Sequence, residues 1–168
     1  MPSEKNKAIF LDRDGVINEE RGDYTWLLED FKLNKDLIPA LQAFQKEGYL
    51  LIIISNQGGI GKGMYTKADA DYLHLHLERH LENQGIHISE VYYCPHHPDN
   101  TKCICRKPDS LLLEKAMARF GIDPKLSWFI GDADRDVEAG TKAGVRTLKV
   151  LSNSSLLEIL PLILEKSY

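Results

Sequence analysis

Short apolar runs alternate with segments of helical pattern along the chain. The runs end abruptly in polar or glycine-containing turns, and they cover residues 8–11, 49–54, 91–93, 128–130 and 145–150. The helical segments each end at a glycine, which suits a left-handed C-cap, and they cover residues 37–47, 66–84, 110–120 and 134–143. A last helix is expected over residues 156–165, with Pro161 disturbing its first turns. Apolar strands alternating with helices predict a doubly wound α/β fold, with a mainly parallel sheet covered on both faces.

The composition and net charge of the chain exclude some classes of binding partner. A chain of 168 residues with a net charge of −4 fits one globular domain, residues 1–168, and offers no positive field for nucleic acid or an anionic membrane. The start is polar and the longest wholly apolar stretch, residues 50–54, is too short for a membrane helix, so neither a signal peptide nor a span is expected. The three cysteines, an odd number, favour a metal over a disulfide scaffold. We therefore expect a cytoplasmic monomer that acts on a small molecule.

Carboxylates follow two of the expected strands. Asp12 and Asp14 come directly after the first run, and Asp132 follows the run that ends at residue 130. In a parallel sheet these positions meet at the carboxyl edge, where such folds bind ligands. Paired carboxylates repel unless a cation lies between them, and oxygen ligands favour Mg²⁺. Asp12-x-Asp14-Gly15 alone could equally be a turn, but the second acidic motif, Asp132-x-x-x-Asp136, makes a Mg²⁺ site the better interpretation.

One lysine is placed to balance these charges. Lys107 follows Arg106 and precedes Pro108, which restrains its backbone and opens the next helix. Beside the carboxylates and a metal, Lys107 would complete the counter-charge for a phosphoryl group. A solvated Arg-Lys pair before a helix is the alternative.

Four soft ligands lie within twelve residues. Cys94-x-His96 followed by Cys103-x-Cys105 supplies enough groups for one tetrahedral Zn²⁺, although the one-residue gaps are tighter than common zinc-finger spacing. His97 is an alternative to His96. A four-ligand site has no open position, so this zinc would be structural and would fix the loop that leads to Lys107.

Four motifs together resemble the haloacid dehalogenase-like phosphatases. They are Asp12-Arg13-Asp14-Gly15-Val16, Ser55-Asn56-Gln57, Arg106-Lys107-Pro108 and Gly131-Asp132-x-x-x-Asp136, in the order and spacing of that superfamily and over nearly the whole chain. The Cys-Pro-His segment and the Cys-x-Cys-Arg-Lys-Pro ending are similar to those of the D,D-heptose 1,7-bisphosphate phosphatases and the histidinol-phosphate phosphatases. The same resemblance favours His96 over His97 as the zinc ligand.

The resemblance implies a role for each matching residue. Asp12 would attack phosphorus and form an aspartyl-phosphate, while Asp14 would protonate the leaving oxygen and then deprotonate water. Ser55 and Lys107 would hold the phosphoryl oxygens. Mg²⁺ would be bound by Asp12, the backbone carbonyl of Asp14 and Asp132, with Asp136 orienting these groups. Ala133 departs from the pattern, because the heptose enzymes carry Lys there and the histidinol enzymes Arg, so Arg135 could supply the missing contact.

The segments between the motifs are too short for a large cap, so substrate recognition is expected from short loops, namely residues 19–24, residues 57–64 and the zinc loop. We expect these substrate-binding residues: Glu20, Arg21, Gly22, Tyr24, Asn56, Gln57 and Arg106. The glycine-rich segment 58–63 departs from both Walker and dinucleotide motifs and is expected to be a flexible active-site turn.

The resemblance implies a Mg²⁺-dependent phosphatase that removes the 7-phosphate of D-glycero-D-manno-heptose 1,7-bisphosphate. Histidinol-phosphate phosphatase is the alternative substrate class. Polynucleotide 3′-phosphatases share the nucleophile motif but are disfavoured by the acidic balance. A receiver-like signalling module is the alternative of another class, although such a module lacks an acid two residues after its phosphorylated Asp.

Overall fold

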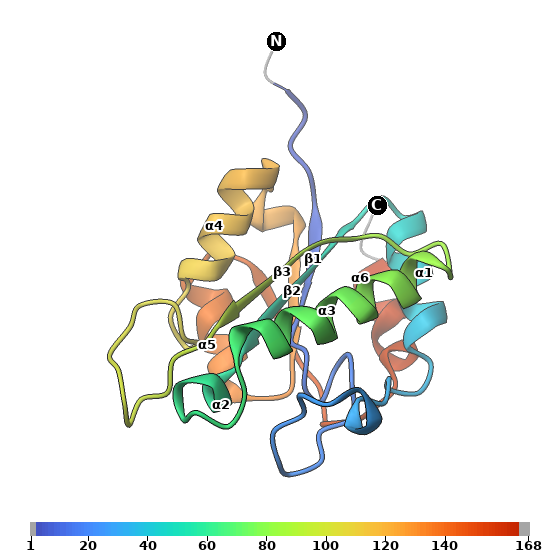
Figure 1. Cartoon of the computed structure of the whole chain (residues 1–168). Helices are drawn as coiled ribbons and strands as arrows, with labels where there is room; N and C mark the ends of the chain where they lie inside the picture. The colour runs from blue at the N-terminus through green and yellow to red at the C-terminus, as the bar shows by residue number, and fades with distance from the viewer. Residues whose placement is uncertain (1–2, 165–168) are drawn as a thin grey trace.

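Five parallel strands form the centre of the computed structural model, which describes residues 3–164 (Figure 1). They are β1 (Ala8–Leu11), β2 (Leu50–Asn56), β3 (Ile88–Cys94), β4 (Trp128–Gly131) and β5 (Arg146–Lys149). Their order in the sheet is β3-β2-β1-β4-β5, and every neighbouring pair is parallel. The chain moves outward from β1 in one direction and then returns to place β4 on its other side. The carboxyl ends of β1 and β4 therefore flank the topological switch point, where open α/β sheets bind ligands.

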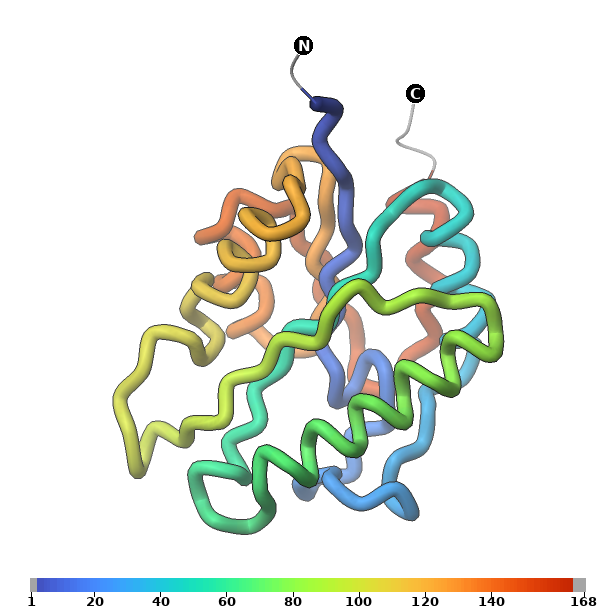
Figure 2. Tube along the Cα trace, turned by 45° about the horizontal axis from the view of Figure 1, so that its top comes forward, coloured from blue at the N-terminus to red at the C-terminus, as the bar shows by residue number. Residues whose placement is uncertain are grey.

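Helices cover both faces of this sheet. They are α1 (Leu37–Lys46), α2 (Gly58–Gly61), α3 (Lys67–Glu82), α4 (Leu111–Phe120), α5 (Asp134–Lys142) and α6 (Leu160–Leu164), with 3₁₀ turns η1 (Leu28–Asp30), η2 (Pro124–Leu126) and η3 (Leu156–Ile159). In Figure 2, α4 and α5 lie on one side of the strands, and α1, α3 and the C-terminal elements lie on the other. None of the described helices is long and apolar enough to cross a membrane.

The alternation of side chains along β1 shows why the strands are apolar throughout. Ile9 and Leu11 belong to the core beneath α1, α3 and α6, whereas Ala8 and Phe10 belong to the core beneath α4 and α5. All four residues are fully buried. Because both faces of the sheet are covered, neither set of alternating positions can be polar. The predicted doubly wound α/β fold is confirmed, and no large cap accompanies it within residues 3–164.

Four local predictions need correction. Helix α4 begins at Leu111 with Ser110 as its N-cap, so Pro108 precedes the helix and does not open it. Strand β2 continues through Ser55 to Asn56, because Asn56 still pairs with Cys94 of β3. The segment expected as a flexible turn contains the helical turn α2, although its three glycines are poor helix formers. The single C-terminal helix is instead η3 followed by α6, with Pro161 in the first turn of α6, where the missing N–H costs no helical bond. Residue 165, the expected end of that helix, lies outside the described residues.

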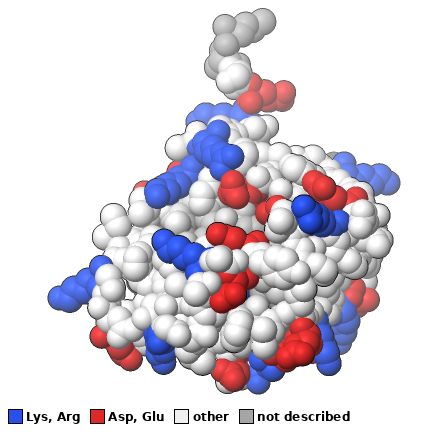
Figure 3. All heavy atoms as spheres, viewed as in Figure 1, with Lys and Arg blue, Asp and Glu red and all other residues white. Residues whose placement is uncertain are grey.

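Charged residues on the face of Figure 3 are mixed in sign. Lys and Arg lie scattered among Asp and Glu there and form no continuous stripe, while acidic groups gather at the hollow near the middle of the view. The charge distribution on this face agrees with the small negative net charge of the sequence.

Candidate active site

A cavity of about 410 Å³ opens at the carboxyl edge of the sheet. Asp12 and Asp14 follow β1, Gln57 follows β2 and Asp132 follows β4, so separate segments supply one site. The full lining comprises Asp12, Asp14, Glu20, Gly22, Asp23, Tyr24, Thr25, Asn56, Gln57, Gly58, Arg106, Asp132 and Arg135. Carboxylates outnumber cations in this lining, so a cation or a positively charged partner is needed before an anionic substrate can bind.

A buried lysine lies between two buried aspartates at the base of the site. Lys107 Nζ is 2.8 Å from Asp12 Oδ1 and 2.7 Å from Asp136 Oδ1, and all three residues are at most 5% exposed. Burial raises the pKa of Asp12 to about 8; Lys107 opposes this rise, while Asp136 and Asp132 add to it. Burial alone would lower the pKa of Lys107, but Asp12 and Asp136 raise it above its ordinary value. Lys107 is therefore held as a cation beside Asp12, and with a pKa of about 8 Asp12 becomes the carboxylate needed for attack when a further cation lies beside it.

The backbone of Lys107 is fixed by Asn56. The Asn56 amide donates from Nδ2 to the Lys107 carbonyl at 3.1 Å and accepts from the Lys107 N–H at Oδ1 at 3.0 Å. Both polar ends of the side chain are thus used on one residue of the neighbouring loop. Asn56 lines the cavity, but its hydrogen bonds position the lysine.

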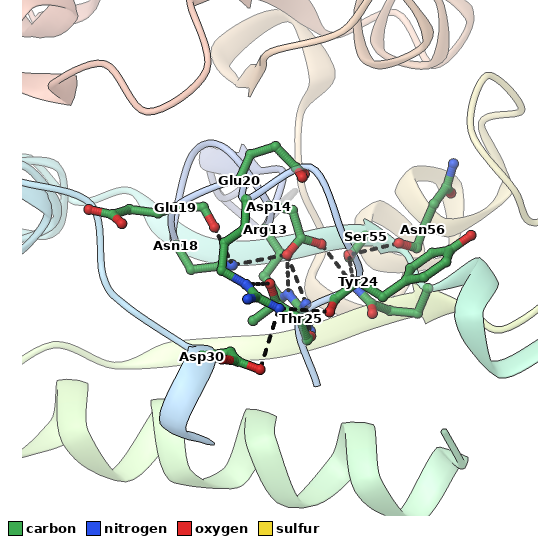
Figure 4. Close-up of polar contacts among 12 residues, drawn as sticks. Arg13, Asp14, Asn18, Glu19, Glu20, Tyr24, Thr25, Asp30, Ser55 and Asn56 are labelled. Carbon is green, nitrogen blue, oxygen red and sulfur yellow. Dashed lines mark hydrogen bonds and ion pairs between the residues drawn. The ribbon is translucent and has the colours of Figure 1, made fainter. Parts of the chain in front are cut away.

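Asp14 presents two unequal oxygens. Its Oδ1 accepts from Arg13 Nη2 at 2.8 Å, from Arg13 Nε at 3.3 Å and from Asn18 Nδ2 at 2.9 Å (Figure 4). Within the described residues, Oδ2 accepts only from Gln57 Nε2, at 3.2 Å. Burial acts to raise the pKa of Asp14, but Arg13, Asn18 and Gln57 outweigh burial and hold the pKa below its ordinary value. Because Oδ1 already faces three donor hydrogens, Oδ2 is the oxygen that can carry a proton.

Arg13 connects Asp14 to two other parts of the fold. Its side chain is 1% exposed and donates to the Thr25 carbonyl at 2.6 Å, in the loop that lines the cavity. Its Nη1 lies 3.1 Å from Nε2 of His74 on α3. Burial, with a further effect of Arg13, lowers the pKa of His74 to about 3, so the ring is neutral and accepts the hydrogen bond from Arg13. The aspartate, the loop and the helix are therefore held in one arrangement.

The acidic groups fit a divalent cation. Asp12, Asp132 and Asp136 each offer an oxygen, and these oxygens lie within 4.8 Å of one another. Hard carboxylate oxygens are the donors that Mg²⁺ prefers. Asp136 uses one oxygen on Lys107 and the other on the N–H of Ala133, which leaves Asp12 and Asp132 better placed to bind a metal. Gly15, with φ +92°, leaves the space that Asp132 needs, because a Cβ there would strike Asp132 Oδ2.

The predicted zinc ligands form a second cluster. Cys94 Sγ, His96 Nδ1, Cys103 Sγ and Cys105 Sγ all lie within 4.8 Å of one another. The separation is 3.4 Å from Cys94 to His96, 3.6 Å from Cys94 to Cys103, 3.3 Å from His96 to Cys105 and 3.0 Å from Cys94 to Cys105. Ligands of a tetrahedral zinc are separated by roughly 3.5–3.8 Å, so the three thiols and the imidazole are the right donors for Zn²⁺ and lie slightly closer together than the bound metal would hold them. His97 faces Asp99 instead, with 3.5 Å between Nδ1 and Oδ2.

The structure distributes the predicted substrate residues unevenly. Glu20, Gly22, Tyr24, Asn56, Gln57 and Arg106 line the cavity. Arg21 does not line it, because its guanidinium pairs with Asp30 at 3.4 Å and donates to the Tyr24 carbonyl and the Thr25 hydroxyl. Ser55 and Lys107 lie buried beneath the cavity, with Ser55 Oγ accepting from Gln57 Nε2 at 2.8 Å.

A few site residues were missed by sequence reasoning. The lining includes Thr25, which lies just outside the expected recognition loops, whereas Asp23 and Gly58 lie within those loops and Arg135 is the suggested substitute for the basic residue absent at position 133. His74 and Tyr65 reach the site only through Arg13 and Gln57. No signal in the sequence separates these two residues from ordinary core positions, since their roles depend on contacts between distant segments.

Comparisons with known proteins agree with this geometry. A family model described as HAD-hydrolase-like matches residues 104–161. A relative from Photorhabdus laumondii, named D-glycero-alpha-D-manno-heptose-1,7-bisphosphate 7-phosphatase, is 38% identical over 151 residues, which cover 86% of this chain and 82% of the relative. The chain belongs to the haloacid dehalogenase-like phosphatases.

Two further proteins are similar to this chain, one over a smaller share of its own length and the other at a lower sequence identity. The histidine biosynthesis bifunctional protein HisB of Legionella pneumophila is 39% identical, over 86% of this chain but 41% of that protein. A crystal structure of the D,D-heptose 1,7-bisphosphate phosphatase from B. bronchiseptica, complexed with magnesium and phosphate, superposes with a TM-score of 0.79 at 27% identity, covering 84% of this chain and 78% of that one. The protein is thus a phosphoric monoester hydrolase, as the motifs predicted, and the receiver-like alternative is set aside.

Proposed function

We propose that this phosphatase removes the 7-phosphate of D-glycero-D-manno-heptose 1,7-bisphosphate through an aspartyl-phosphate, within a single domain of residues 1–168. The main support for phosphoryl transfer through Asp12 is its contact with Lys107, together with the position of Asp14 in the same cavity. The substrate is supported by relatives at 38–40% identity that are named heptose-1,7-bisphosphate 7-phosphatases.

Asp12 has one oxygen available as the nucleophile. Its Oδ1 accepts from Lys107 Nζ at 2.8 Å and from the Arg13 N–H at 2.9 Å, so we assign the attack to Oδ2. In the first step Oδ2 forms a bond to phosphorus, the bond from phosphorus to the sugar oxygen breaks, and its electron pair leaves with that oxygen. Lys107 stays close to the reacting phosphoryl group and stabilises its negative charge. Water then releases phosphate from the aspartyl-phosphate and restores Asp12.

Asp14 handles the proton in both steps. Its Oδ2 gives a proton to the leaving sugar oxygen and then takes one from the attacking water. In the free protein the pKa of Asp14 is below its ordinary value, and the negative charge of an arriving phosphate acts to raise it. Proton donation by Asp14 therefore requires that bound substrate raise its pKa, and release of phosphate removes that effect.

Mg²⁺ would be held by Asp12, the backbone carbonyl of Asp14 and Asp132, and when bound it supplies positive charge to the phosphoryl oxygens. Asp136 would hold Lys107 and the backbone N–H of Ala133 in place, and so would orient the residues around the metal.

Phosphate release from two substrates tests the substrate assignment. The purified protein with Mg²⁺ should release phosphate from heptose 1,7-bisphosphate with a higher kcat/KM than from histidinol phosphate. Histidinol phosphate is the second candidate, favoured by the 39% identity to the bifunctional protein HisB. A higher kcat/KM for histidinol phosphate would replace the heptose assignment and leave the phosphatase chemistry in place.

Arg106 is the residue we assign to the part of the substrate that is not cleaved. It lines the cavity, and its Nη1 lies 3.3 Å from the carbonyl of His96, so its side chain extends beside the zinc loop. Arg106→Ala should lower kcat/KM for heptose 1,7-bisphosphate by ~10–100-fold, or roughly 1.4–2.8 kcal/mol, through loss of a charge-assisted hydrogen bond. Turnover of p-nitrophenyl phosphate, which has no second phosphate, should change little.

A matched variant separates charge from structure in this experiment. Arg119→Ala removes an exposed arginine that pairs with Glu90 outside the cavity, and it should leave both rates unchanged. Parallel losses on both substrates in Arg106→Ala would show that Arg106 supports the catalytic centre or the loop, and not substrate choice.

We also propose that one structural Zn²⁺ is bound by Cys94, His96, Cys103 and Cys105. We further propose that the protein is a monomer and is located in the cytoplasm. The cluster directly precedes Arg106 and Lys107, so the metal would fix the loop that delivers both cations. A reducing compartment keeps the thiols available as ligands.

Cys103→Ser should lower zinc content and stability together. Elemental analysis should find one zinc per unmodified chain and markedly less in the variant, and Tm should fall by roughly 4–8 °C for a loss of about 2 kcal/mol. His96→Asn should behave like Cys103→Ser, whereas His97→Asn should keep its zinc, because His97 faces Asp99. An equally stable Cys103→Ser protein in which neither form contains zinc would contradict the metal assignment.

A further inference from the structure

The side-chain amide of Gln57 is held at three points. Its Oε1 accepts a hydrogen bond from the Tyr65 hydroxyl at 2.5 Å. Its Nε2 donates one hydrogen to Ser55 Oγ at 2.8 Å and the other to Asp14 Oδ2 at 3.2 Å. Both amide hydrogens and the amide oxygen are therefore used, and Gln57 is only 2% exposed.

The opposite orientation of this amide would leave a buried hydrogen without an acceptor. Tyr65 is 4% exposed, and within residues 3–164 its hydroxyl forms a hydrogen bond with Gln57 alone. Burial raises the pKa of Tyr65 to about 12, so the hydroxyl keeps its hydrogen at neutral pH. If the amide turned over, the hydroxyl would face the NH₂ group of Gln57 and its own hydrogen would lose its acceptor, which is unfavourable in a buried site.

Amide orientation matters because Gln57 faces the oxygen of Asp14 that carries the proton. With the NH₂ group of Gln57 toward Oδ2, a proton on Oδ2 finds no acceptor in Gln57 and is donated toward the cavity. With the carbonyl oxygen toward Oδ2, the proton would be donated to Gln57 instead of the leaving group.

We propose that Tyr65 is a positioning residue for catalysis: its hydroxyl fixes the Gln57 amide so that protonated Asp14 donates to the leaving group. This inference rests on the acid role of Asp14 in the proposed function. The Tyr65 ring has a separate, structural role, because it stacks on Trp26 with 5.8 Å between ring centroids and packs against Gly59. Replacement by phenylalanine removes the hydroxyl and retains the ring.

A double-mutant cycle with Tyr65→Phe, Gln57→Ala and the double variant tests the inference. In the parent background, Tyr65→Phe should lower kcat for heptose 1,7-bisphosphate by about 3–10-fold with KM changing less than about twofold. Its effect on p-nitrophenyl phosphate should be smaller, because that leaving group needs little protonation. In the Gln57→Ala background, Tyr65→Phe should have no further effect, because the residue through which it acts is gone.

Tyr93→Phe is the matched control. It removes a hydroxyl that donates to Asp71 at 2.6 Å outside the cavity, and it should leave both rates unchanged. Equal losses from Tyr65→Phe in both backgrounds, equal losses on both substrates, or full activity of Tyr65→Phe would each overturn the inference. A parent protein that releases phosphate from neither substrate would instead overturn the proposed function.

Discussion

Asp12→Asn should lower kcat by at least about 1,000-fold on every phosphate ester, which corresponds to roughly 4 kcal/mol of transition-state stabilisation. The amide is nearly isosteric with the carboxylate but is a far poorer nucleophile. It can still accept the hydrogen bonds that Lys107 Nζ and the Arg13 N–H donate to Asp12 Oδ1. Steady-state phosphate release, together with Tm from thermal unfolding, checks the loss of activity and the retention of the fold.

Asp134→Asn is the matched control for this substitution. Asp134 lies at the start of α5, and its exposed carboxylate pairs with Lys149 at 2.7 Å instead of facing the cavity. The control should keep the parent rate. If Asp12→Asn retained activity within tenfold of the parent, hydrolysis through an aspartyl-phosphate on Asp12 would be ruled out.

The placement of the reacting groups could be predicted because it depends on sheet topology. Asp12 and Asp132 each follow an apolar run, and parallel strands bring their carboxyl ends to one edge. A motif at a strand end therefore has a known position even though the partner strand is distant in the sequence. The same holds for the cluster of cysteines and His96, whose ligands are close in sequence and need only one loop to meet.

Loop orientation could not be predicted in the same way. Residues 19–27 have no regular period, so nothing in the sequence indicates that Tyr24 faces the cavity while Arg21 turns toward Asp30. Element boundaries were wrong for a related reason. The apolar pattern ends at Ile54, but pairing with β3 extends β2 through Ser55 and Asn56, and sequence alone does not show where a partner strand ends.

Hydrogen-bond networks between distant segments also could not be predicted from the sequence. Arg13 stands between two motif aspartates, yet its burial depends on Thr25 and on His74, which is 61 positions away on α3. An arginine between acidic residues is ordinarily solvated, so its pattern suggests exposure. In the structure its donors are used on the Asp14 carboxylate, the Thr25 carbonyl and the neutral His74 ring, which makes burial of the charge possible.

The two oxygens of Asp14 lead to a prediction about leaving groups. Oδ1 is occupied by Arg13 and Asn18, and Oδ2 faces Gln57 and the cavity. Asp14→Asn removes the transferable proton while keeping a group of similar size. It should lower kcat/KM for a sugar phosphate by ~100–10,000-fold, because the alkoxide leaving group needs protonation in the transition state. For p-nitrophenyl phosphate the loss should be about tenfold or less, since the nitrophenolate leaves without a proton.

The measurement that decides between acid catalysis and a structural effect is the ratio of the two losses. An altered cavity or a weakened Arg13 contact would slow both esters by the same factor, because both place their phosphoryl group beside Asp12 and Lys107. Loss of the acid alone slows only the ester with the poor leaving group, so the sugar phosphate should fall at least ~10-fold further than the aryl phosphate. Equal losses in Asp14→Asn, with Asp134→Asn at the parent rate, would show that Asp14 shapes the site without donating the proton.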